Sequence, residues 1–338
     1  MFLIAQDCLI LHKSNKMREM KVSVLLPIYG VESYIAQCAT SLMEQTYKDV
    51  EYIFVNDCTP DASMEQLKQV LESYPERNSN VQILEHEQNM GVAMARITAL
   101  NAATGEAVIF VDSDDFVATT MVECLVAEMQ SSSADIVDAG YAIVCNGAIT
   151  KKCIPMHVND KAYLKTILCQ NVEPNRIWGR LIKKSLFEQN GISFTPGVNY
   201  GEDFSVLPRL LVNACRSLAD DCLYYYRDDN PQSYTNNITT KNAVSYLKAQ
   251  QIVGEYFVKH PKCKDYVFAM QLGWVNVWRF ARRFNVDKLL VEEHFNLKST
   301  NLIIRYLSSV MKNEKIPYKL ANFLYLSTRK IYLALFGR

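Results

Sequence analysis

Short apolar segments alternate with helix-like segments from Lys21 onward, and this alternation restricts the fold more than any other feature of the chain. The segments with the length and apolar character of buried strands are Val22–Ile28, Val50–Val55, Val81–Leu84 and Ala107–Val111. The segments with helical spacing of apolar residues are Ser33–Gln45, with Ser33 as the predicted N-cap, Asp61–Tyr74 and Gly91–Ala103. Strands that alternate with helices of this length form a parallel sheet with right-handed crossovers. We therefore predict an α/β fold with a doubly wound, mostly parallel sheet flanked by helices.

The chain has 338 residues, which is long for one compact core and suits about two domains. We expect residues 1–20 to be a tail outside the fold, because Lys13–Met20 is polar and the strand pattern begins at Lys21. Residues 21–235 are predicted to form the α/β domain and residues 236–338 a helical region. The predicted helices of that region are Ala243–Val258, Lys264–Phe284 and Asn301–Lys312.

Charge and cysteine content exclude some classes of protein. Lys plus Arg equals Asp plus Glu, at 36 each, so the net charge does not favour a nucleic-acid partner. No apolar run reaches the length of about 20 residues that a membrane-spanning helix requires. The ten cysteines include no Cys-x-x-Cys pair, which argues against a zinc site and predicts reduced, mostly buried thiols in the cytoplasm.

An apolar strand ends in three carboxylates in the segment Val108–Phe116 (Val-Ile-Phe-Val-Asp-Ser-Asp-Asp-Phe). Asp112 and Asp114 are two residues apart, so they project to the same side of an extended backbone. Neighbouring carboxylates repel each other, and a hard divalent cation with oxygen ligands offsets that repulsion. The alternative is a solvated acidic turn before the next helix.

Polar clusters follow each of the four predicted strands. They contain Pro27 and Tyr29 after the first strand, Asn56–Asp61 after the second, Asn89 and Gly91 with the later Arg96 after the third, and Asp112–Asp115 after the fourth. Ligands of parallel α/β sheets bind beyond the carboxyl ends of the strands, so these clusters predict one binding site. The chain has neither Gly-x-Gly-x-x-Gly nor a P-loop motif, which removes the main support for a dinucleotide or P-loop site.

The residue types in these clusters suit a nucleoside diphosphate with a bound cation. Asp57 can accept hydrogen bonds from a base, Tyr29 can stack on the base or contact the ribose, and Arg96 can reach the base or a phosphate. Asp112 suits the ribose hydroxyls or the metal, and Asp114 suits the metal. The predicted nucleotide-binding set also includes Pro27, Asn89, Gly91 and Ser113.

Each of these assignments has a structural alternative. Tyr29 can be an aromatic residue at the surface rim, Asp57 can cap the helix that follows it, and Arg96 can pair with Glu85 or Glu87.

Four segments together resemble the family 2 glycosyltransferases, which have the GT-A fold. They are Val22–Tyr29, Tyr52–Asp61, Asn89–Arg96 and Val108–Phe116. The resemblance covers about Lys21 to Thr235. Asn56 and Cys58 depart from the acidic motif that the family carries after the second strand, although Asp57 is retained, and Gly30 replaces a common Asn.

The resemblance implies an inverting transferase of the hexosyltransferase class, in which a carboxylate removes the proton of the attacking hydroxyl. Glu202 and Asp203 match the family's Glu-Asp motif at the start of a helix. Asp203 is the predicted base, and Glu202 is predicted to position the acceptor or the donor sugar. The alternative for both is a carboxylate that interacts with a helix dipole.

Two further segments resemble parts of the family pattern. Trp178, in Ile177–Leu181, is predicted to form a wall for the acceptor sugar or, alternatively, to pack in the core. Arg180 is expected to contact a phosphate or to be solvated. The residues Tyr224–Arg227 are predicted to be an edge strand, and Arg227 with Ser233 is predicted to close a loop over the diphosphate.

The C-terminal end is basic as well as apolar. The segment Asn301–Arg338 has a net charge of +6, in a chain that is neutral as a whole. Such a segment suits a helix on an anionic membrane surface, and the alternative is a helix packed on the protein or in an oligomer interface. Trp274 and Trp278 lie four residues apart and are expected to pack in the core or between domains.

We therefore expect a cytoplasmic glycosyltransferase, peripheral on the inner face of the membrane if the tail binds lipid. It would use Mg²⁺ or Mn²⁺ to transfer a sugar from a nucleotide sugar, expected to be a UDP-sugar. The expected acceptor is a hydroxyl of a bacterial surface glycan or a lipid-linked saccharide, and no nucleic-acid partner is expected. The alternatives are a catalytically idle nucleotide-sugar binding subunit and a nucleotidyltransferase.

Overall fold

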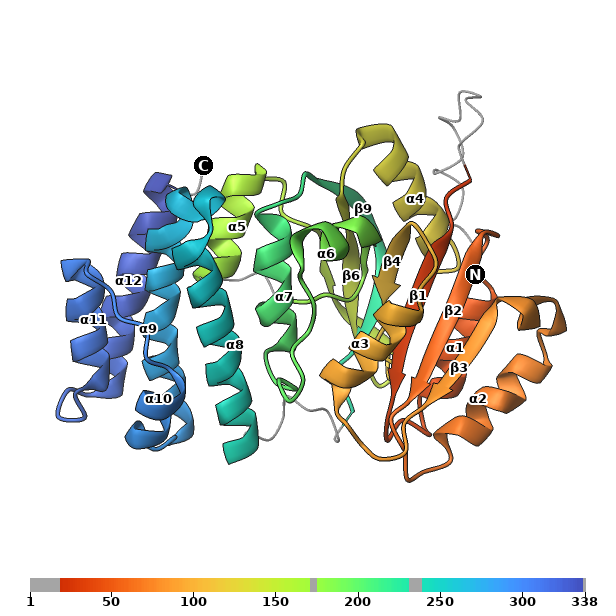
Figure 1. Ribbon diagram of the computed structural model, residues 1–338, viewed down its shortest axis with the longest axis horizontal. Helices are drawn as coiled ribbons and strands as arrows, with labels where there is room; N and C mark the ends of the chain where they lie inside the picture. The colour runs from red at the N-terminus through yellow and green to blue at the C-terminus, as the bar shows by residue number, and fades with distance from the viewer. Residues whose placement is uncertain (1–18, 171–174, 231–238, 337–338) are drawn as a thin grey trace.

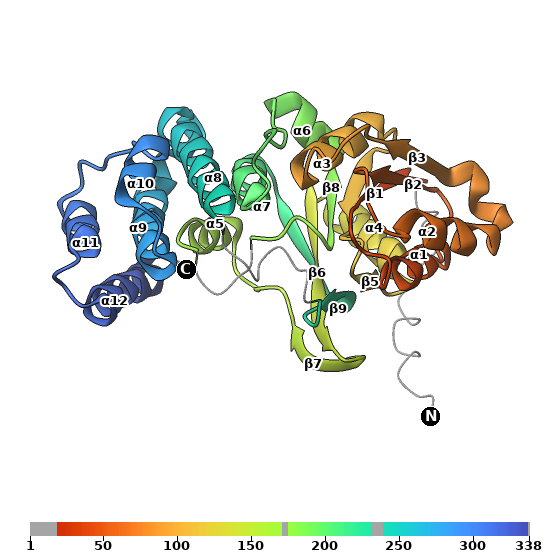
Figure 2. The ribbon, with the colours of Figure 1, turned by 90° about the horizontal axis from the view of Figure 1, so that it is seen from below.

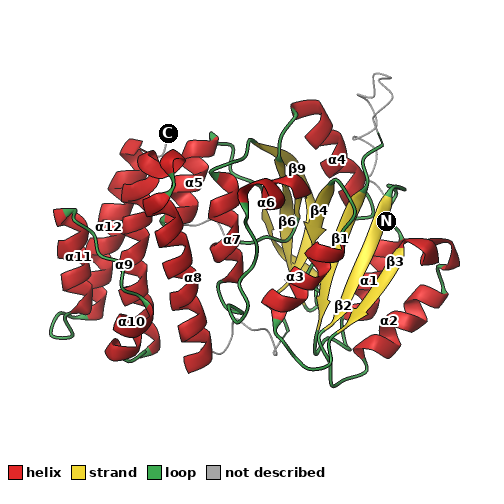
Figure 3. Cartoon of the chain, viewed as in Figure 1, coloured by secondary structure: helices red, strands yellow, loops and turns green. Residues whose placement is uncertain are grey.

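The computed structural model of the chain describes residues 19–170, 175–230 and 239–336. In these residues the chain forms a nine-stranded sheet with helices on both faces, followed by a layer of further helices (Figures 1 and 3). The strand order is β3-β2-β1-β4-β8-β6-β9-β5, and β7 pairs with β6 outside this order. The predicted α/β architecture with a C-terminal helical region is confirmed. Most of the predicted N-terminal tail, residues 1–18, lies outside the described residues.

The first half of the sheet is parallel. Its elements are β1 (Val22–Ile28), α1 (Ile35–Met43), β2 (Val50–Asn56), α2 (Ser63–Glu72), the 3₁₀ helix Pro75–Asn80, β3 (Val81–Glu85), α3 (Val92–Ala102) and β4 (Ala107–Phe110). Strand β1 pairs with β2 and β4, and β2 pairs with β3, all in parallel. These elements agree with the predicted ones to within a few residues. Ser33 is not the N-cap of α1, because that helix begins at Ile35 after Tyr34 and has no side-chain cap.

The second half of the sheet mixes parallel and antiparallel pairs. Its elements are β5 (Phe116–Val117), α4 (Met121–Ser132), β6 (Ile136–Cys145), β7 (Ala148–Cys153), α5 (Asp160–Leu168), β8 (Arg180–Lys183), α6 (Lys184–Asn190), α7 (Glu202–Leu211) and β9 (Arg216–Arg227). Strand β8 runs antiparallel to β4 and β6, whereas β6 and β9 are parallel. Figure 2 shows the β6–β7 hairpin projecting from the body of the molecule.

Strand β9 is an interior strand, so the prediction of an edge strand at Tyr224–Arg227 is wrong. It lies between β6 and β5 in the sheet, and the Tyr224 side chain is fully buried. A run of three tyrosines does not by itself indicate burial. The strands that flank these residues in the sheet come from distant parts of the chain.

Alternate residues of the central strands enter two hydrophobic cores on opposite faces of the sheet. In β4, Ile109 belongs to the core that contains α1, α2 and α4, and Phe110 belongs to the core that contains α3, α6 and α7. This second core continues through α5 into the C-terminal helices, as far as Tyr332. The helical region therefore shares a core with one face of the sheet.

The C-terminal region is helical, as predicted. Its elements are α8 (Thr240–Lys259), the 3₁₀ helix Pro261–Tyr266, α9 (Val267–Phe284), α10 (Lys288–His294), α11 (Leu302–Lys312) and α12 (Tyr318–Phe336). The prediction that Trp274 and Trp278 pack in a core is confirmed, because both belong to the second core and are at least nine-tenths buried. Across the described residues, no helix combines the length and the apolar character that a bilayer crossing demands.

The cysteines agree only in part with the expectation. The nine that the structure describes form no disulfide bond. Only Cys38, Cys169 and Cys263 among them are buried, so the expectation of mostly buried thiols is wrong. The others lie on strands, helix faces and loops that meet the surface.

Candidate functional site

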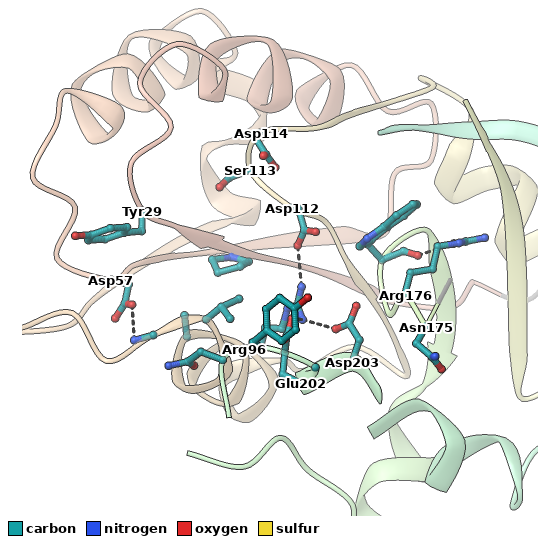
Figure 4. A pocket seen from close by; sticks show the side chains of 18 of the residues that line it. Tyr29, Asp57, Arg96, Asp112, Ser113, Asp114, Asn175, Arg176, Glu202 and Asp203 are labelled. Atoms are coloured by element: carbon teal, nitrogen blue, oxygen red, sulfur yellow. Dashed lines mark hydrogen bonds and ion pairs between the residues drawn. The ribbon is translucent and has the colours of Figure 1, made fainter. Parts of the chain in front are cut away.

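A cavity of about 790 Å³ lies at the carboxyl ends of β1, β2 and β4 (Figure 4). It is also lined by the start of α3, the start of α7 and residues of α8. All of the predicted site residues except Arg227 and Ser233 line it: Pro27, Tyr29, Asp57, Asn89, Gly91, Arg96, Asp112, Ser113, Asp114, Trp178, Glu202 and Asp203. The prediction that the polar clusters meet at one edge of the sheet is therefore confirmed.

Asp57 holds the loop that leads into α3. Its Oδ1 accepts a hydrogen bond from the Met90 amide (2.8 Å), and its Oδ2 accepts one from the Gly91 amide (2.7 Å). The side chain also contacts His86 Nδ1 at 2.7 Å, and Asp57 is 2% exposed. The alternative that Asp57 caps the helix following it is wrong, because Asp61 accepts the Ser63 amide at the start of α2. Tyr29, by contrast, is 49% exposed at the rim of the cavity.

Gly91 is required by the close approach of another loop. Its φ is +87°, and an added Cβ would lie 2.1 Å from Asn199 Nδ2. Asn199 Oδ1 in turn accepts a hydrogen bond from the Ala93 amide (3.1 Å) in the first turn of α3. The loop before α7 is thereby tied to the start of α3, which brings two walls of the cavity together.

Arg96 is the central cation of the cavity. Its guanidinium pairs with Asp112 (Nη2 to Oδ1, 2.8 Å), Glu202 (Nη1 to Oε1, 2.9 Å) and Asp203 (Nη1 to Oδ1, 2.5 Å), as Figure 4 shows. The residue is 2% exposed. Pairing with Glu85 or Glu87, the alternative from the sequence, is wrong. Arg96 instead joins the carboxylate after β4 to the two carboxylates at the start of α7.

The two carboxylates of α7 differ in environment. Burial and the nearby charge of Asp203 raise the pKa of Glu202 to about 8, although Arg96 acts in the opposite direction. Burial also raises the pKa of Asp203, and Arg96 again opposes the rise. Asp203 Oδ2 accepts a hydrogen bond from the Ile177 amide (2.9 Å). Burial therefore makes both carboxyl groups at the start of α7 harder to ionise, and the Arg96 guanidinium opposes this effect at both.

The acidic turn after β4 is held from behind by β9. Asp115 is buried and accepts hydrogen bonds from the Tyr224 hydroxyl and the Arg227 amide, both at 2.7 Å. Asp114 lines the cavity, and its Oδ2 accepts a hydrogen bond from Asn230 (2.8 Å). Burial and the charge of Asp112 raise the pKa of Asp114. Negative charge is thus concentrated at this turn.

The donor set at this turn fits a hard divalent cation. Asp112 and Asp114 present carboxylate oxygens to the same cavity, and oxygen is the ligand that Mg²⁺ and Mn²⁺ prefer. No group of three His, Cys, Asp or Glu side chains suited to a metal occurs in the part of the chain that the structure describes. A cation at this position would therefore take its other ligands from a bound diphosphate and water.

Trp178 packs against other side chains in the core, as the alternative interpretation predicted. It also lines the cavity. Its ring stacks on Tyr224 at 4.4 Å and on Tyr226 at 5.5 Å between centroids, and the Arg176 guanidinium lies 4.7 Å from it. The residue is 8% exposed. The contact of Trp178 with an acceptor sugar stays a prediction.

Two arginines lie elsewhere than the sequence indicated. Arg180 is fully buried and pairs with Asp138 at 2.9 Å, so neither phosphate contact nor solvation applies. Arg227 does not line the cavity: its Nε donates to the Asp114 carbonyl (3.0 Å) and its Nη2 to Gln37 (2.6 Å), which holds the back of the acidic turn. Ser233 lies outside the described residues.

Several residues that line the cavity were not predicted. Arg176 is 3% exposed and donates to the carbonyls of Trp178 and Ala139, both at 2.7 Å. Helix α8 contributes Lys241, Tyr246 and Gln250. Arg176 lies two residues before Trp178 and was within reach of the sequence argument, whereas α8 offered no motif that marks a site.

Comparisons with a protein family and with individual proteins both find glycosyltransferases. The model of the family described as "Glycosyl transferase family 2" matches residues 23–190. Glycosyltransferase EpsJ of Bacillus subtilis is 32% identical over 223 residues, which cover 63% of this chain and 62% of EpsJ. Glycosyltransferase YibD of Escherichia coli is 26% identical over 309 residues, which cover 88% of this chain and 81% of YibD. The match thus spans less than two thirds of EpsJ, and only 25% of GlyA of Streptococcus pneumoniae, which is 33% identical.

Solved structures share the fold. TarS 1–349 of S. aureus has a TM-score of 0.64 at 19% identity, and the match covers 92% of each chain. The same protein in complex with UDP-GlcNAc has a TM-score of 0.63 at 18% identity, again with 92% of each chain covered. A match over 92% of the chain is longer than the α/β part alone, so it extends into the C-terminal helices.

Proposed function

Because this chain belongs to glycosyl transferase family 2, we propose that it transfers one sugar from a nucleotide sugar to an acceptor hydroxyl, with inversion at the anomeric carbon. One observation carries this proposal. Arg96 brings Asp112, on the donor side of the cavity, together with Glu202 and Asp203, on the side that an acceptor would enter. A single cavity thereby holds the groups that a one-step displacement needs: carboxylates for a cation beside the leaving diphosphate, and a separate base.

The proposed donor is a UDP-sugar. Tyr29 is exposed at the rim, where it can stack on a uracil ring, and Asp57 and Asn89 lie at the same end of the cavity. Both Asp57 oxygens already accept amide hydrogen bonds, so its main contribution would be to hold the loop that contacts the base. The structural similarity to TarS 1–349, which was solved with UDP-GlcNAc, supports the same choice of nucleotide.

The proposed cofactor is Mg²⁺ or Mn²⁺, held by Asp114 and Asp112. When bound, such a cation would neutralise the charge on the departing diphosphate. Asp112 already pairs with Arg96, so the guanidinium supplies positive charge on the other side of the same carboxylate. Ser113 and Gly91 also line this cavity, and their small size would leave room for the phosphates.

The proposed base is Asp203, which would take the proton of the acceptor hydroxyl as that oxygen attacks the anomeric carbon. The Ile177 amide and Arg96 fix its two carboxylate oxygens, each of which keeps a further lone pair. Glu202 would hold the sugar through hydrogen bonds. Trp178 would limit the acceptor side of the cavity with the edge of its ring.

The proposed acceptor is a bacterial surface glycan or a lipid-linked saccharide. A relative from Bacillus spizizenii that is 26% identical over 90% of this chain is named poly(ribitol-phosphate) beta-glucosyltransferase, and this match covers 45% of that protein. Its name supports a cell-surface polymer as the class of acceptor. The family relationship disfavours the nucleotidyltransferase alternative, and Asp203 acting as the proposed base would disfavour an idle binding subunit.

Two substitutions test the site. Asp114→Ala should weaken the binding of UDP in the presence of Mn²⁺, measured by calorimetry, and leave the Mn²⁺-independent component unchanged. Asp203→Asn should keep UDP binding and abolish both transfer and the slow hydrolysis of UDP-glucose or UDP-N-acetylglucosamine. Asp265→Asn, at an exposed carboxylate far from the cavity, is the control for both. Hydrolysis at the wild-type rate in Asp203→Asn would show that this base assignment is wrong.

The helical region is proposed to contact an anionic membrane surface. Helix α12 exposes Leu320, Phe323, Ile331 and Leu335, each more than half accessible, beside basic residues such as Lys319 and Lys330. Exposed apolar side chains of this kind, flanked by Lys, suit the headgroup layer of a bilayer. The double variant Phe323→Ser, Leu335→Ser should bind vesicles containing phosphatidylglycerol less well than the wild type, and equal binding would exclude α12 as the contact.

A further inference from the structure

A second cavity, of about 520 Å³, lies in the C-terminal helical region between α9, α11 and the segment after α10. These helices form the end of the molecule opposite the sheet (Figure 1), so this cavity is remote from the one at the strand ends. Its floor is apolar: Trp274, Trp278 and Ile304 line it and are each less than one-tenth exposed. We call this cavity the basic groove, because three cations, Lys298, Arg305 and Lys312, also line it.

The charge of the basic groove is one-sided. No Asp or Glu is among the residues that line it, and within the described residues none of its three cations has an ion-pair partner. Glu292, a carboxylate whose charge acts on Lys312, pairs with Lys288 at 3.9 Å. Three like charges gathered at one groove repel one another, and an anion bound between them removes that repulsion.

Hydroxyl groups and a partly desolvated ammonium complete the groove. Ser308 and Ser309 of α11 line it next to Arg305 and Lys312. Lys312 is exposed, and its Nζ lies 4.1 Å from the centroid of the Trp278 ring, which places this charge against the apolar floor. Ammonium, guanidinium and serine hydroxyl groups together form the usual donor set for a phosphate group.

An exposed apolar stripe flanks the basic groove on the same helix. Leu302 and Tyr306 are one helical turn apart on α11, and they are 76% and 60% exposed. Arg305 and Ser309 follow on the adjacent face, which lines the groove. Exposed apolar side chains beside the site would contribute nothing to the binding of a soluble anion. The headgroup layer of a membrane, by contrast, accommodates both leucine and tyrosine.

We propose that the basic groove binds the phosphate-bearing headgroup of an anionic phospholipid, with Leu302 and Tyr306 inserted among the adjoining acyl chains. This inference deepens the proposed membrane contact and rests on it. It assigns the lipid selectivity to α9 and α11 rather than to the apolar face of α12. The groove would thereby anchor the end of the molecule that lies farthest from the sheet.

The test uses the full chain and vesicles of phosphatidylcholine, alone or mixed with phosphatidylglycerol, in a co-sedimentation assay. The triple variant Lys298→Gln, Arg305→Gln, Lys312→Gln should bind the mixed vesicles at least roughly tenfold more weakly than the wild type. The matched control Lys68→Gln, Lys248→Gln, Lys264→Gln removes the same charge from exposed positions outside the groove and should change binding less than about twofold. Circular dichroism confirms that both variants fold.

A second variant separates a lipid headgroup from a soluble phosphate. Leu302→Ser, Tyr306→Ser should weaken vesicle binding, and calorimetry with glycerol 3-phosphate should show no comparable binding by the wild type. Equal vesicle binding by the groove triple variant and its control would overturn the groove while leaving the α12 contact intact. Binding of glycerol 3-phosphate without vesicle binding would overturn the lipid assignment, and binding of neither would overturn both membrane proposals. None of these outcomes depends on UDP binding or sugar transfer, which are measured separately.

Discussion

Arg96 Nη1 lies 2.5 Å from Asp203 Oδ1, although the two residues are 107 positions apart in the sequence. The same guanidinium holds Asp112 through its other terminal nitrogen. The proposed base and the proposed donor-side carboxylate therefore share one cation, and each of the pairs is largely removed from water.

Loss of the Arg96 guanidinium should destabilise the protein. Arg96→Gln leaves three carboxylates in the cavity without their cation, so we expect the free energy of unfolding to fall by about 3 kcal/mol or more, measured by urea denaturation. Arg305→Gln, at an exposed arginine with no ion pair among the described residues, is the control. An equal effect of the two substitutions would mean that the cluster around Arg96 does not stabilise the fold.

Gly91 and Gly147 offer a matched pair of glycines. Both have positive φ, at +87° and +74°, but only Gly91 faces a neighbour that a Cβ would meet. Gly147→Ala should cost about 1 kcal/mol of stability from backbone strain. Gly91→Ala should cost at least about 2 kcal/mol more, because the new methyl group displaces Asn199. Thermal unfolding of both variants measures these two losses of stability. Similar losses in the two variants would show that Asn199 moves away freely.

Asp138 should be more important for stability than any surface carboxylate. It is 1% exposed and pairs with Arg180 at 2.9 Å and Arg216 at 3.3 Å, both of them buried. Asp138→Asn leaves the buried Arg180 guanidinium without its counter-ion and leaves Arg216 with only the longer pair to Asp160 (3.9 Å), so a loss of about 3–5 kcal/mol is expected. Asp265→Asn breaks an exposed pair with Lys161 and should have little effect. The midpoints and slopes of urea unfolding curves are enough to compare the two variants. Unfolding of both variants at the same midpoint would contradict the prediction.

Glu51 should make stability depend on acid pH. Burial acts to raise its pKa, but hydrogen bonds from Lys21, Ser23 and Thr104 outweigh burial and lower the pKa from 4.5 to about 2. A carboxylate with a lowered pKa in the folded state stabilises the fold above its unfolded pKa, and this contribution is lost as the pH falls from about 4.5 towards about 2. Glu51→Gln should therefore flatten the slope of unfolding free energy against pH in this range. Glu72→Gln should keep the wild-type slope, and a wild-type slope in Glu51→Gln as well would contradict the assignment.

Much of the site could be predicted because strand ends are local features. Apolar runs that stop at Ile28, Val55 and Val111 predict where parallel strands end, and parallel strands end at the same edge. Asp57, Arg96 and Asp112 could therefore be grouped in one cavity before any contact was known. Asp203 could be added only through the resemblance of its motif to the family pattern.

The partners of buried polar residues could not be predicted. Arg180 has the sequence context of an exposed or ligand-binding arginine, but Asp138 on β6 makes its burial tolerable. Arg227 was expected at the diphosphate, but the pairing of β9 with β5 places it behind the acidic turn. The environment of each arginine depends on which distant strand pairs with its own strand. The local spacing of apolar residues does not indicate that pairing.

The sequence by itself determined the strand and helix pattern, the edge of the sheet at which the polar clusters meet, and the acidic turn of Asp112 and Asp114. These features follow from backbone geometry and from the alternation of apolar and polar residues over a few positions. Only the tertiary structure decided that Arg96 joins Asp112 to Asp203, that Trp178 is stacked between tyrosines and an arginine, and that α8 closes the cavity. Charges and rings are stabilised inside a protein only by partners that replace water, and those partners are brought within reach only when segments a hundred residues apart pack together.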